Sequence, residues 1–311
     1  MDSADLVCLL YRVEWSPSTE GLLKGKTVPE LPEVETIKND LRALVVTRRI
    51  TGAHVLHYPL VKHPSVAEFE AGLRGQTIEN VDRKAKYLLI SLSSGKILAV
   101  QLIITGQLLL VDPEKPLRKS TRLILDLDNR RQLRLADSSR LARAYLLDSN
   151  ELYAYLPLAE LGPEVISDEL TLDLFKRLVG SRHRQIKAVL LDQRIVSGLG
   201  NIYTDETLFD SRIHPLRSAS SLSEQELERL YRAIRRMVPE AIALRGTTTR
   251  SYLDVLGHKG GYQRQLKVVG RAGQPCPAGC GGTVVREWMA GRETYYCPSC
   301  QQLPSRTTKA A

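Results

Sequence analysis

The hydrophobic positions near the beginning of the chain follow a helical period. Between residues 32 and 46, apolar side chains recur at the three- and four-residue spacing of a single helical face. These side chains are Val34, Ile37, Leu41 and Leu44. The pattern predicts one amphipathic helix, with its apolar face turned toward a core.

Short apolar segments separated by turn residues follow this helix. Two pairs of segments flank Ser-Ser-Gly and Asp-Asn turns and predict β-hairpins. The pairs are 87–92 with 97–100 and 122–127 with 132–135, and a further apolar segment is 108–111. Many short strands of this kind predict a β-sandwich over roughly 47–148.

From about residue 158 the hydrophobic period becomes helical. Ser223 and Glu226 have the spacing of a capping box, and apolar residues continue from Leu227 at helical spacing until Gly246. Two short strands are predicted near the C-terminus, at 283–288 and 293–296. The expected fold is therefore α+β and multidomain.

Charge narrows the class of partner without deciding it. The 311 residues carry 44 Lys and Arg against 35 Asp and Glu, a net charge of +9. Such an excess favours nucleic acid or a membrane surface, although a merely basic soluble enzyme fits as well. No apolar run approaches the roughly 18 residues of a membrane span, and the N-terminus lacks the basic start of a signal peptide. We therefore expect a cytoplasmic, reduced protein.

Four cysteines near the C-terminus have the spacing C-x3-C-x16-C-x2-C. Two close pairs of thiolates suit tetrahedral Zn²⁺, and four protein ligands leave no open position for catalysis. Disulfide pairing is the alternative for such a set. The predicted ligands of one structural zinc ion are Cys276, Cys280, Cys297 and Cys300.

Four further segments carry a family resemblance, in the family's order. They are Pro-Glu-Leu-Pro-Glu-Val-Glu-Thr at 29–36, Lys-Ala-Lys-Tyr-Leu-Leu at 84–89, Gly-Leu-Gly-Asn-Ile-Tyr-Thr-Asp-Glu at 198–206 and Gly-Arg-Glu-Thr-Tyr-Tyr-Cys at 291–297. Together with the cysteines, they resemble the bacterial formamidopyrimidine-DNA glycosylases over about 29–302. The first segment is similar, but not identical, to the start of the sister endonuclease VIII group.

The resemblance implies a catalytic group at the start of the first helix. Pro29 would be the nucleophile, because the family's mature N-terminus is a proline whose secondary amine attacks the sugar C1′ and forms an iminium. Glu30 would act as general acid–base at the sugar, with Glu33 one helical turn further on. Without the resemblance, these carboxylates would indicate only favourable charge at a helix N-terminus.

The resemblance also implies contacts to DNA with an extruded base, in a basic cleft between the domains. Lys86, on a strand, would contact a phosphate near the lesion and complete the catalytic set. Asn201 would donate to a phosphate that the backbone at Gly200 approaches, although it also suits a helix N-cap. The remaining predicted DNA contacts are Arg140, Lys187 and, at a hairpin tip, Arg292.

One departure from the family concerns Pro29, which is not the first residue. An internal proline nitrogen is an amide without a usable lone pair, so it cannot form an iminium. Our hypothesis is a misread start: Val28 stands where an initiator methionine would be, because a GTG codon encodes Val internally and Met at initiation. Residues 1–27 would then be a misannotated or disordered extension.

A second departure concerns the wedge that fills the space left by the extruded nucleotide. The family places Met, Arg and Phe there, whereas this chain has Ile104, Ser139 and Leu141. An apolar wedge is still expected, but the arginine that would face the opposite base is lost. In the loop that covers the base, Arg250 stands where a Lys is sometimes found. The opposite-base preference is therefore left open.

The resulting prediction is a base-excision-repair glycosylase with abasic-site (AP) lyase activity. It would remove formamidopyrimidines and 8-oxoguanine and cut the strand by β,δ-elimination, as a zinc-containing, nucleoid-associated monomer on double-stranded DNA. Two alternatives are a non-catalytic protein that binds damaged or abasic DNA, and a glycosylase for oxidised pyrimidines. The predicted domains are a catalytic β-sandwich domain at 28–150, a helix–two-turn–helix domain at 155–246 and a zinc finger at 262–303.

Overall fold

The computed structural model describes residues 28–303, so the predicted extension 1–27 lies outside the described residues. The chain forms two compact units. Of the described residues, unit 1 contains 28–161 and Pro239–Arg264, and unit 2 contains Gly162–Val238 and 265–303. The segment Pro239–Arg264 therefore belongs to unit 1, although it follows the helical residues of unit 2 in the sequence.

Unit 1 begins with helix α3 (Leu31–Val45), where a helix was predicted. Pro32 suits the first turn because proline lacks the N–H that would have no helical partner there. Val34, Ile37 and Leu41 are almost completely buried, so the predicted apolar face of this helix is confirmed.

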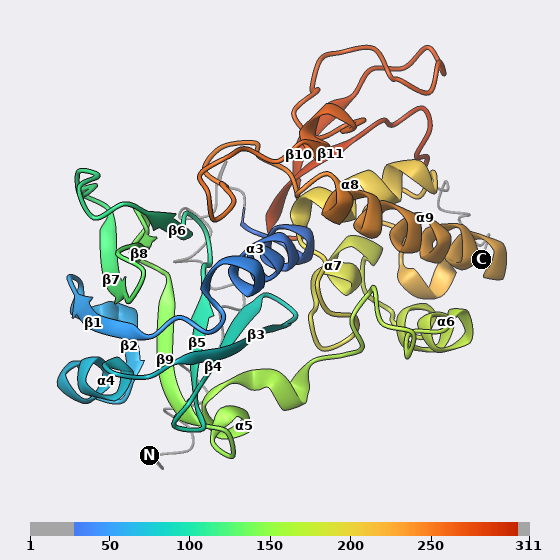
Figure 1. The fold of residues 1–311 in the computed structure, drawn as a ribbon. Helices are drawn as coiled ribbons and strands as arrows, with labels where there is room; N and C mark the ends of the chain where they lie inside the picture. The colour runs from blue at the N-terminus through green and yellow to red at the C-terminus, as the bar shows by residue number, and fades with distance from the viewer. Residues whose placement is uncertain (1–27, 304–311) are drawn as a thin grey trace. The chain divides into compact units, whose positions relative to one another are not determined.

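Two sheets follow α3 in the same unit (Figure 1). One has the order β1-β7-β8-β6 and the other β2-β9-β5-β4-β3. Their neighbouring strands are antiparallel except for the parallel pair β2 and β9. The predicted hairpins are β4–β5 and β7–β8 and are confirmed. The strands are β1 (Ile50–Val55), β2 (Val61–His63), β3 (Ile78–Lys84), β4 (Tyr87–Leu92), β5 (Lys96–Gln101), β6 (Gln107–Val111), β7 (Thr121–Leu127), β8 (Gln132–Ala136) and β9 (Arg143–Asp148).

The core of unit 1 lies between these sheets and two helices. Leu88 and Leu125, one from each sheet, belong to the same buried cluster as residues of α3 and α4 (Val66–Leu73). This arrangement confirms the predicted β-sandwich. On its other face, the five-stranded sheet carries a smaller cluster that includes residues of α5 (Leu152–Tyr155) and η2 (Pro157–Glu160).

Unit 2 is mainly helical before its cysteines. The Glu226 N–H donates to Ser223 Oγ at 3.2 Å, and the Ser223 N–H donates to Glu226 Oε2 at 2.8 Å, which confirms the predicted capping box. The helix that follows, α9, continues past Val238 into unit 1. The helices are α6 (Leu172–Gly180), α7 (Ile186–Leu191), α8 (Asn201–Asp210) and α9 (Glu224–Ala243), with the short 3-10 turn η3 (Ala219–Ser221). Two further 3-10 turns, η1 (Tyr58–Leu60) and η4 (Tyr262–Arg264), belong to unit 1.

The C-terminal part of unit 2 is a β-hairpin of β10 (Val285–Met289) and β11 (Arg292–Tyr296). Ala290 and Gly291 form its two-residue turn with φ of 50° and 69°, as a type I′ hairpin requires. Phe209 of α8 packs in one cluster with Val268, Val284 and two of the cysteines. Among the described residues, no helix is long and apolar enough to cross a membrane.

Candidate functional site

The start of α3 gathers three of the four predicted catalytic residues, all but Lys86. Pro29 and Glu30 are buried just before the helix, and Glu33 is the third helical residue. The Glu30 N–H donates to Glu33 Oε2 at 2.8 Å, and the Glu30 side chain accepts from the Glu33 N–H. This reciprocal pair fixes both carboxylates at the helix terminus that Pro29 precedes, where the dipole favours negative charge.

A segment far along the chain, at Gly246 and Thr247, contacts the Glu33 carboxylate. The Thr247 N–H donates to Glu33 Oε1 at 2.7 Å, so each carboxylate oxygen accepts one backbone hydrogen bond. Gly246 precedes it with φ of +78°, and a Cβ at this position would lie 2.8 Å from Glu33 Oε1. A glycine is therefore required here both by backbone conformation and by the approach of the carboxylate.

Arg245 anchors the turn that holds Glu33. Its Nη2 donates to Asp40 Oδ2 of α3 and to Asp254 Oδ2, both at 2.6 Å. Hydrogen bonds and charge from Asp40 and Asp254 raise the Arg245 pKa above its already high ordinary value. Arg245 keeps φ of +62°, a conformation that non-glycine residues adopt rarely. These two ion pairs offset that backbone strain.

The predicted lesion loop continues from this anchor. Its Val255 carbonyl accepts from the Leu110 N–H of β6 at 2.8 Å, and its Ser251 carbonyl accepts from Gln107. Arg250 is exposed and directly precedes these attachments. The loop is thus attached to Glu33 of α3 before Arg250 and to the sandwich after it.

Lys86 lies in a turn rather than on the predicted strand. Ala85 and Lys86 form the two-residue connection between β3 and β4, with Ala85 at φ of +48°. Lys86 is half-buried there. The sequence suggested a strand because the apolar residues of β4 begin immediately after Lys86.

The predicted wedge residues lie in two loops that Thr105 connects. Thr105 directly follows Ile104 in the sequence. The Ser139 N–H donates to Thr105 Oγ1 at 2.8 Å, which joins the two loops. Leu141 and Ser139 are half-buried. Ile104, by contrast, is 1% exposed, so in this structure it is part of the core and presents no wedge to solvent.

Asp137 organises the second of these loops. Its carboxylate accepts from Ser139 Oγ at 2.6 Å and from the N–H groups of Leu141 and Ala142 at 2.7 and 2.8 Å. Burial of Asp137 on its own would raise its pKa, but these hydrogen bonds hold the pKa below its usual range. Sequence reasoning missed this residue because an isolated aspartate gives no local signal.

In unit 2, the predicted phosphate site lies at the start of α8. Gly200 is the N-cap, and Asn201 is the first helical residue, so the alternative that Asn201 caps the helix is wrong. Asn201 Nδ2 donates to the Glu293 carbonyl at 2.9 Å. Its Oδ1 is buried without a hydrogen-bond partner among residues 28–303.

Lys187 reaches the same carbonyl from α7. Its ammonium donates to Asp205 Oδ1 at 2.6 Å, to Thr294 Oγ1 at 2.7 Å and to the Glu293 carbonyl at 3.0 Å. The side chain is fully buried, and all its protons are donated inside the unit. The predicted direct contact of Lys187 with DNA does not fit this placement. Lys187 instead fixes the beginning of β11, whose first residue is the half-buried Arg292.

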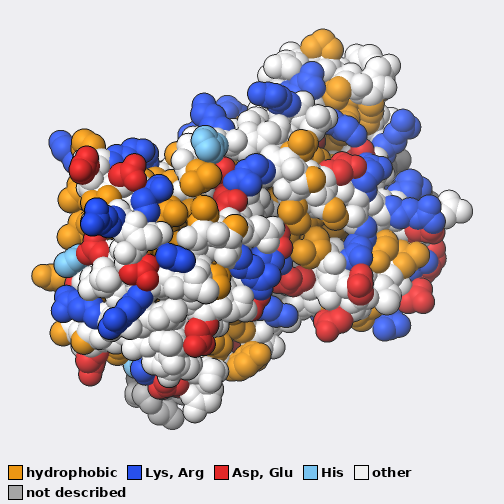
Figure 2. Space-filling model, in the orientation of Figure 1, with side chains coloured by type: hydrophobic (Ala, Val, Ile, Leu, Met, Phe, Trp, Pro, Cys, Tyr) orange, Lys and Arg blue, Asp and Glu red, His pale blue; other side chains and the backbone are white. Residues whose placement is uncertain are grey.

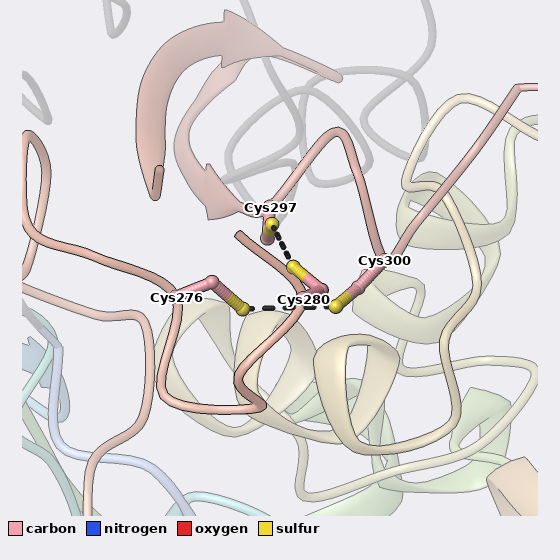
Figure 3. Close-up of side chains that lie close together, drawn as sticks. All are labelled: Cys276, Cys280, Cys297 and Cys300. Carbon is pink, nitrogen blue, oxygen red and sulfur yellow. Dashed lines mark hydrogen bonds between the residues drawn. The ribbon is translucent and has the colours of Figure 1, made fainter. Parts of the chain in front are cut away.

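The four cysteine sulfurs point toward one another from two segments (Figure 3). The Sγ atoms of Cys276 and Cys300, and those of Cys280 and Cys297, are 3.6 Å apart, and all four lie within 4.8 Å of one another. A disulfide would require about 2.05 Å. A tetrahedral zinc with bonds of about 2.3 Å would place sulfurs roughly 3.8 Å apart. The residues therefore fit one structural Zn²⁺.

Comparison with known proteins gives the same assignment for all three predicted parts of the chain from residue 28 onward. The family models that match are the formamidopyrimidine-DNA glycosylase N-terminal domain at 28–144, the formamidopyrimidine-DNA glycosylase H2TH domain at 161–252 and the zinc finger found in FPG and IleRS at 273–303. The formamidopyrimidine-DNA glycosylase of Pelotomaculum thermopropionicum is 41% identical over 276 residues, which cover 89% of this chain and all of that protein. The formamidopyrimidine-DNA glycosylase of Enterococcus faecalis is 38% identical over 282 residues, which cover 91% of this chain and all of that protein.

A solved structure agrees with these relatives. The complex of Lactococcus lactis Fpg with DNA containing an abasic site matches with a TM-score of 0.83 and 31% identity, covering 88% of this chain and 100% of that one. The chain belongs to the formamidopyrimidine-DNA glycosylase family. It is thus a base-excision-repair glycosylase with DNA as its partner and one structural zinc ion as its cofactor. The basic side chains spread over its visible face suit a polyanionic partner (Figure 2).

Within this glycosylase, the buried Lys187 gives a stability prediction. Lys187→Met leaves Asp205 as an uncompensated buried charge, so we expect a loss of about 3–5 kcal/mol in the free energy of unfolding. Chemical denaturation measures it. The exposed Lys259→Met is the matched control and should leave the midpoint unchanged. Equal stability of the two variants would show that Lys187 does not hold β11 in place.

Proposed function

We propose that this chain removes oxidised purines from DNA and then cuts the strand as an AP lyase, with Pro29 as the nucleophile. The observation that carries the proposal is the pair of fixed carboxylates, Glu30 and Glu33, at the helix terminus that this proline precedes. The lyase step requires an amine that can form an iminium and a group that can transfer protons at the sugar. Pro29 and Glu30 supply these two functions.

The active form would begin at Pro29. As a secondary amine with a pKa of about 8, the proline nitrogen would be partly unprotonated at neutral pH. It would attack the sugar C1′, the base would leave with the bonding electrons, and the iminium would activate the sugar for elimination. The match of the family's N-terminal domain from residue 28 supports a start at this position.

Other residues would bind the DNA backbone. We assign phosphate contacts to Lys86 and Arg140 in unit 1, and to the Gly200 backbone, Asn201 and Arg292 in unit 2. Arg250, exposed in a loop tied at both ends, would contact the extruded base. The predicted catalytic, helix–two-turn–helix and zinc-finger domains would provide these groups, and the chain would act as a monomer.

A panel of duplexes, each with a single lesion, tests the substrate. We expect a chain that begins at Pro29 to release formamidopyrimidine and 8-oxoguanine faster than oxidised pyrimidines. Faster release of the pyrimidines would replace the purine assignment. Binding of every duplex without release would instead favour the non-catalytic damage-binding protein.

Glu30→Gln tests the acid–base role. The amide keeps the size of the side chain and an oxygen that can accept from the Glu33 N–H, but it cannot transfer a proton. We expect the rate of base release to fall by about 10²–10⁴ with little change in the unfolding temperature. Single-turnover kinetics on the preferred lesion measures the rate, with Glu79→Gln at an exposed position as the control. An unchanged rate would remove Glu30 from the mechanism.

A further inference from the structure

Basic side chains from three segments of unit 1 are brought together beside the loop that Asp137 organises. We call this group the basic cluster. It consists of His57, which precedes η1, Lys62 on β2, Arg122 on β7, Arg140 in the loop and Arg143 at the start of β9. The sequence analysis singled out Arg140 alone.

Backbone contacts place the first half of the cluster. The Leu56 N–H donates to the Arg122 carbonyl at 2.8 Å, so His57 follows a residue paired with β7. Arg122 Nε in turn donates to the Asp137 carbonyl at 2.9 Å, directly at the base of the loop that carries Arg140. His57, Arg122 and Arg140 therefore lie around one loop.

Strand register places the other half. In the parallel pair of β2 and β9, Val61 is opposite Ala144, so Lys62 lies beside the first residues of β9, next to Arg143. Burial lowers the pKa of Lys62, and the positive charge of Arg143 lowers it further. The two cations are therefore close enough to repel each other.

Among residues 28–303, no acidic side chain pairs with the Lys and Arg side chains of the cluster. Burial lowers the pKa of His57, and the positive charges of Arg122, Arg140 and Lys62 lower it further. The negative charge of Asp137 has the opposite effect. The Asp137 carboxylate is already occupied by hydrogen bonds from its own loop.

We propose that the basic cluster is a binding site for phosphates of the DNA backbone beside the loop 137–142. Like charges held together repel each other, and a bound polyanion removes that repulsion. Such contacts fix the position of the duplex without reading its sequence. The inference rests on the proposed function in DNA repair and assigns part of the interface to named residues.

The salt dependence of DNA binding tests this site. The double variant Lys62→Gln/Arg143→Gln removes two cations, and the control Lys115→Gln/Arg130→Gln removes two exposed cations elsewhere in unit 1. The probe is a duplex with one tetrahydrofuran abasic analogue, and its Kd is measured over a range of salt concentrations. For the cluster variant, we expect the slope of log K against log salt to decrease in magnitude by about 1.8, or 0.9 for each lost phosphate contact.

The control variant should keep the wild-type slope. The cluster variant should nearly keep the wild-type unfolding temperature, because it loses no ion pair and the glutamine amide at position 143 can still donate to the Tyr145 hydroxyl. An unchanged slope in the cluster variant, or an equal change in both variants, would overturn the phosphate site. If the wild-type chain itself does not bind the duplex, the proposed function fails, and this inference fails with it.

Discussion

Borohydride is expected to trap the protein on an abasic-site duplex only when Pro29 is the first residue. An N-terminal proline is a secondary amine that forms an iminium with the opened sugar, and borohydride reduces the iminium to a stable crosslink. In the full-length chain, the same nitrogen belongs to a peptide bond and has no available lone pair. The expected difference is all or none, and gel electrophoresis of the covalent complex measures it.

The full-length chain is the matched control, because the two forms share every residue from Pro29 onward. Equal trapping of both forms would assign the nucleophile to another amine, such as a lysine. Binding without trapping in either form would favour a protein that recognises damage without catalysis. Intact mass of the protein from its own host would show independently whether residues 1–27 are present.

Removal of zinc is expected to abolish DNA binding. Cys297 is fully buried, and Cys276 nearly so, in a cluster with Phe209 of α8, so the finger and α8 share one small core. Structural zinc contributes roughly 10–16 kcal/mol to the folding of zinc-finger peptides, far more than so small a cluster supplies. A chelator should release one zinc ion per chain and disorganise β11, which begins with Arg292. Metal analysis and DNA affinity before and after chelation measure the two effects.

Cys297→Ser should have the same effect without a chelator. Its control is Cys8→Ser, with both variants made in the full-length chain, because Cys8 lies outside the four-cysteine set in the sequence. The β-sheet circular dichroism of the sandwich should persist in both variants, since its core contains no cysteine. Full DNA affinity after complete loss of zinc would show that the finger folds and functions without the metal.

The sequence was sufficient where the physical cause is local. The helical period from Val34 to Leu41 predicted the buried face of α3, because it depends only on residues within a few turns. Turn residues between apolar segments predicted the hairpins β4–β5 and β7–β8 for the same reason. The cysteine spacing likewise predicted one tetrahedral site, since each pair comes from a single short segment.

The tertiary structure decided what distant residues do to one another. No periodicity relates Glu33 to Thr247, which is 214 residues away, yet their hydrogen bond fixes the carboxylate. Lys187 resembled a DNA contact in the sequence, but the fold surrounds it with three acceptors and buries it. The basic cluster arises because β2 pairs in parallel with β9, a contact across about eighty residues. Sequence patterns record the conformation of neighbours along the chain, whereas burial and charge at a site depend on which segments folding brings together.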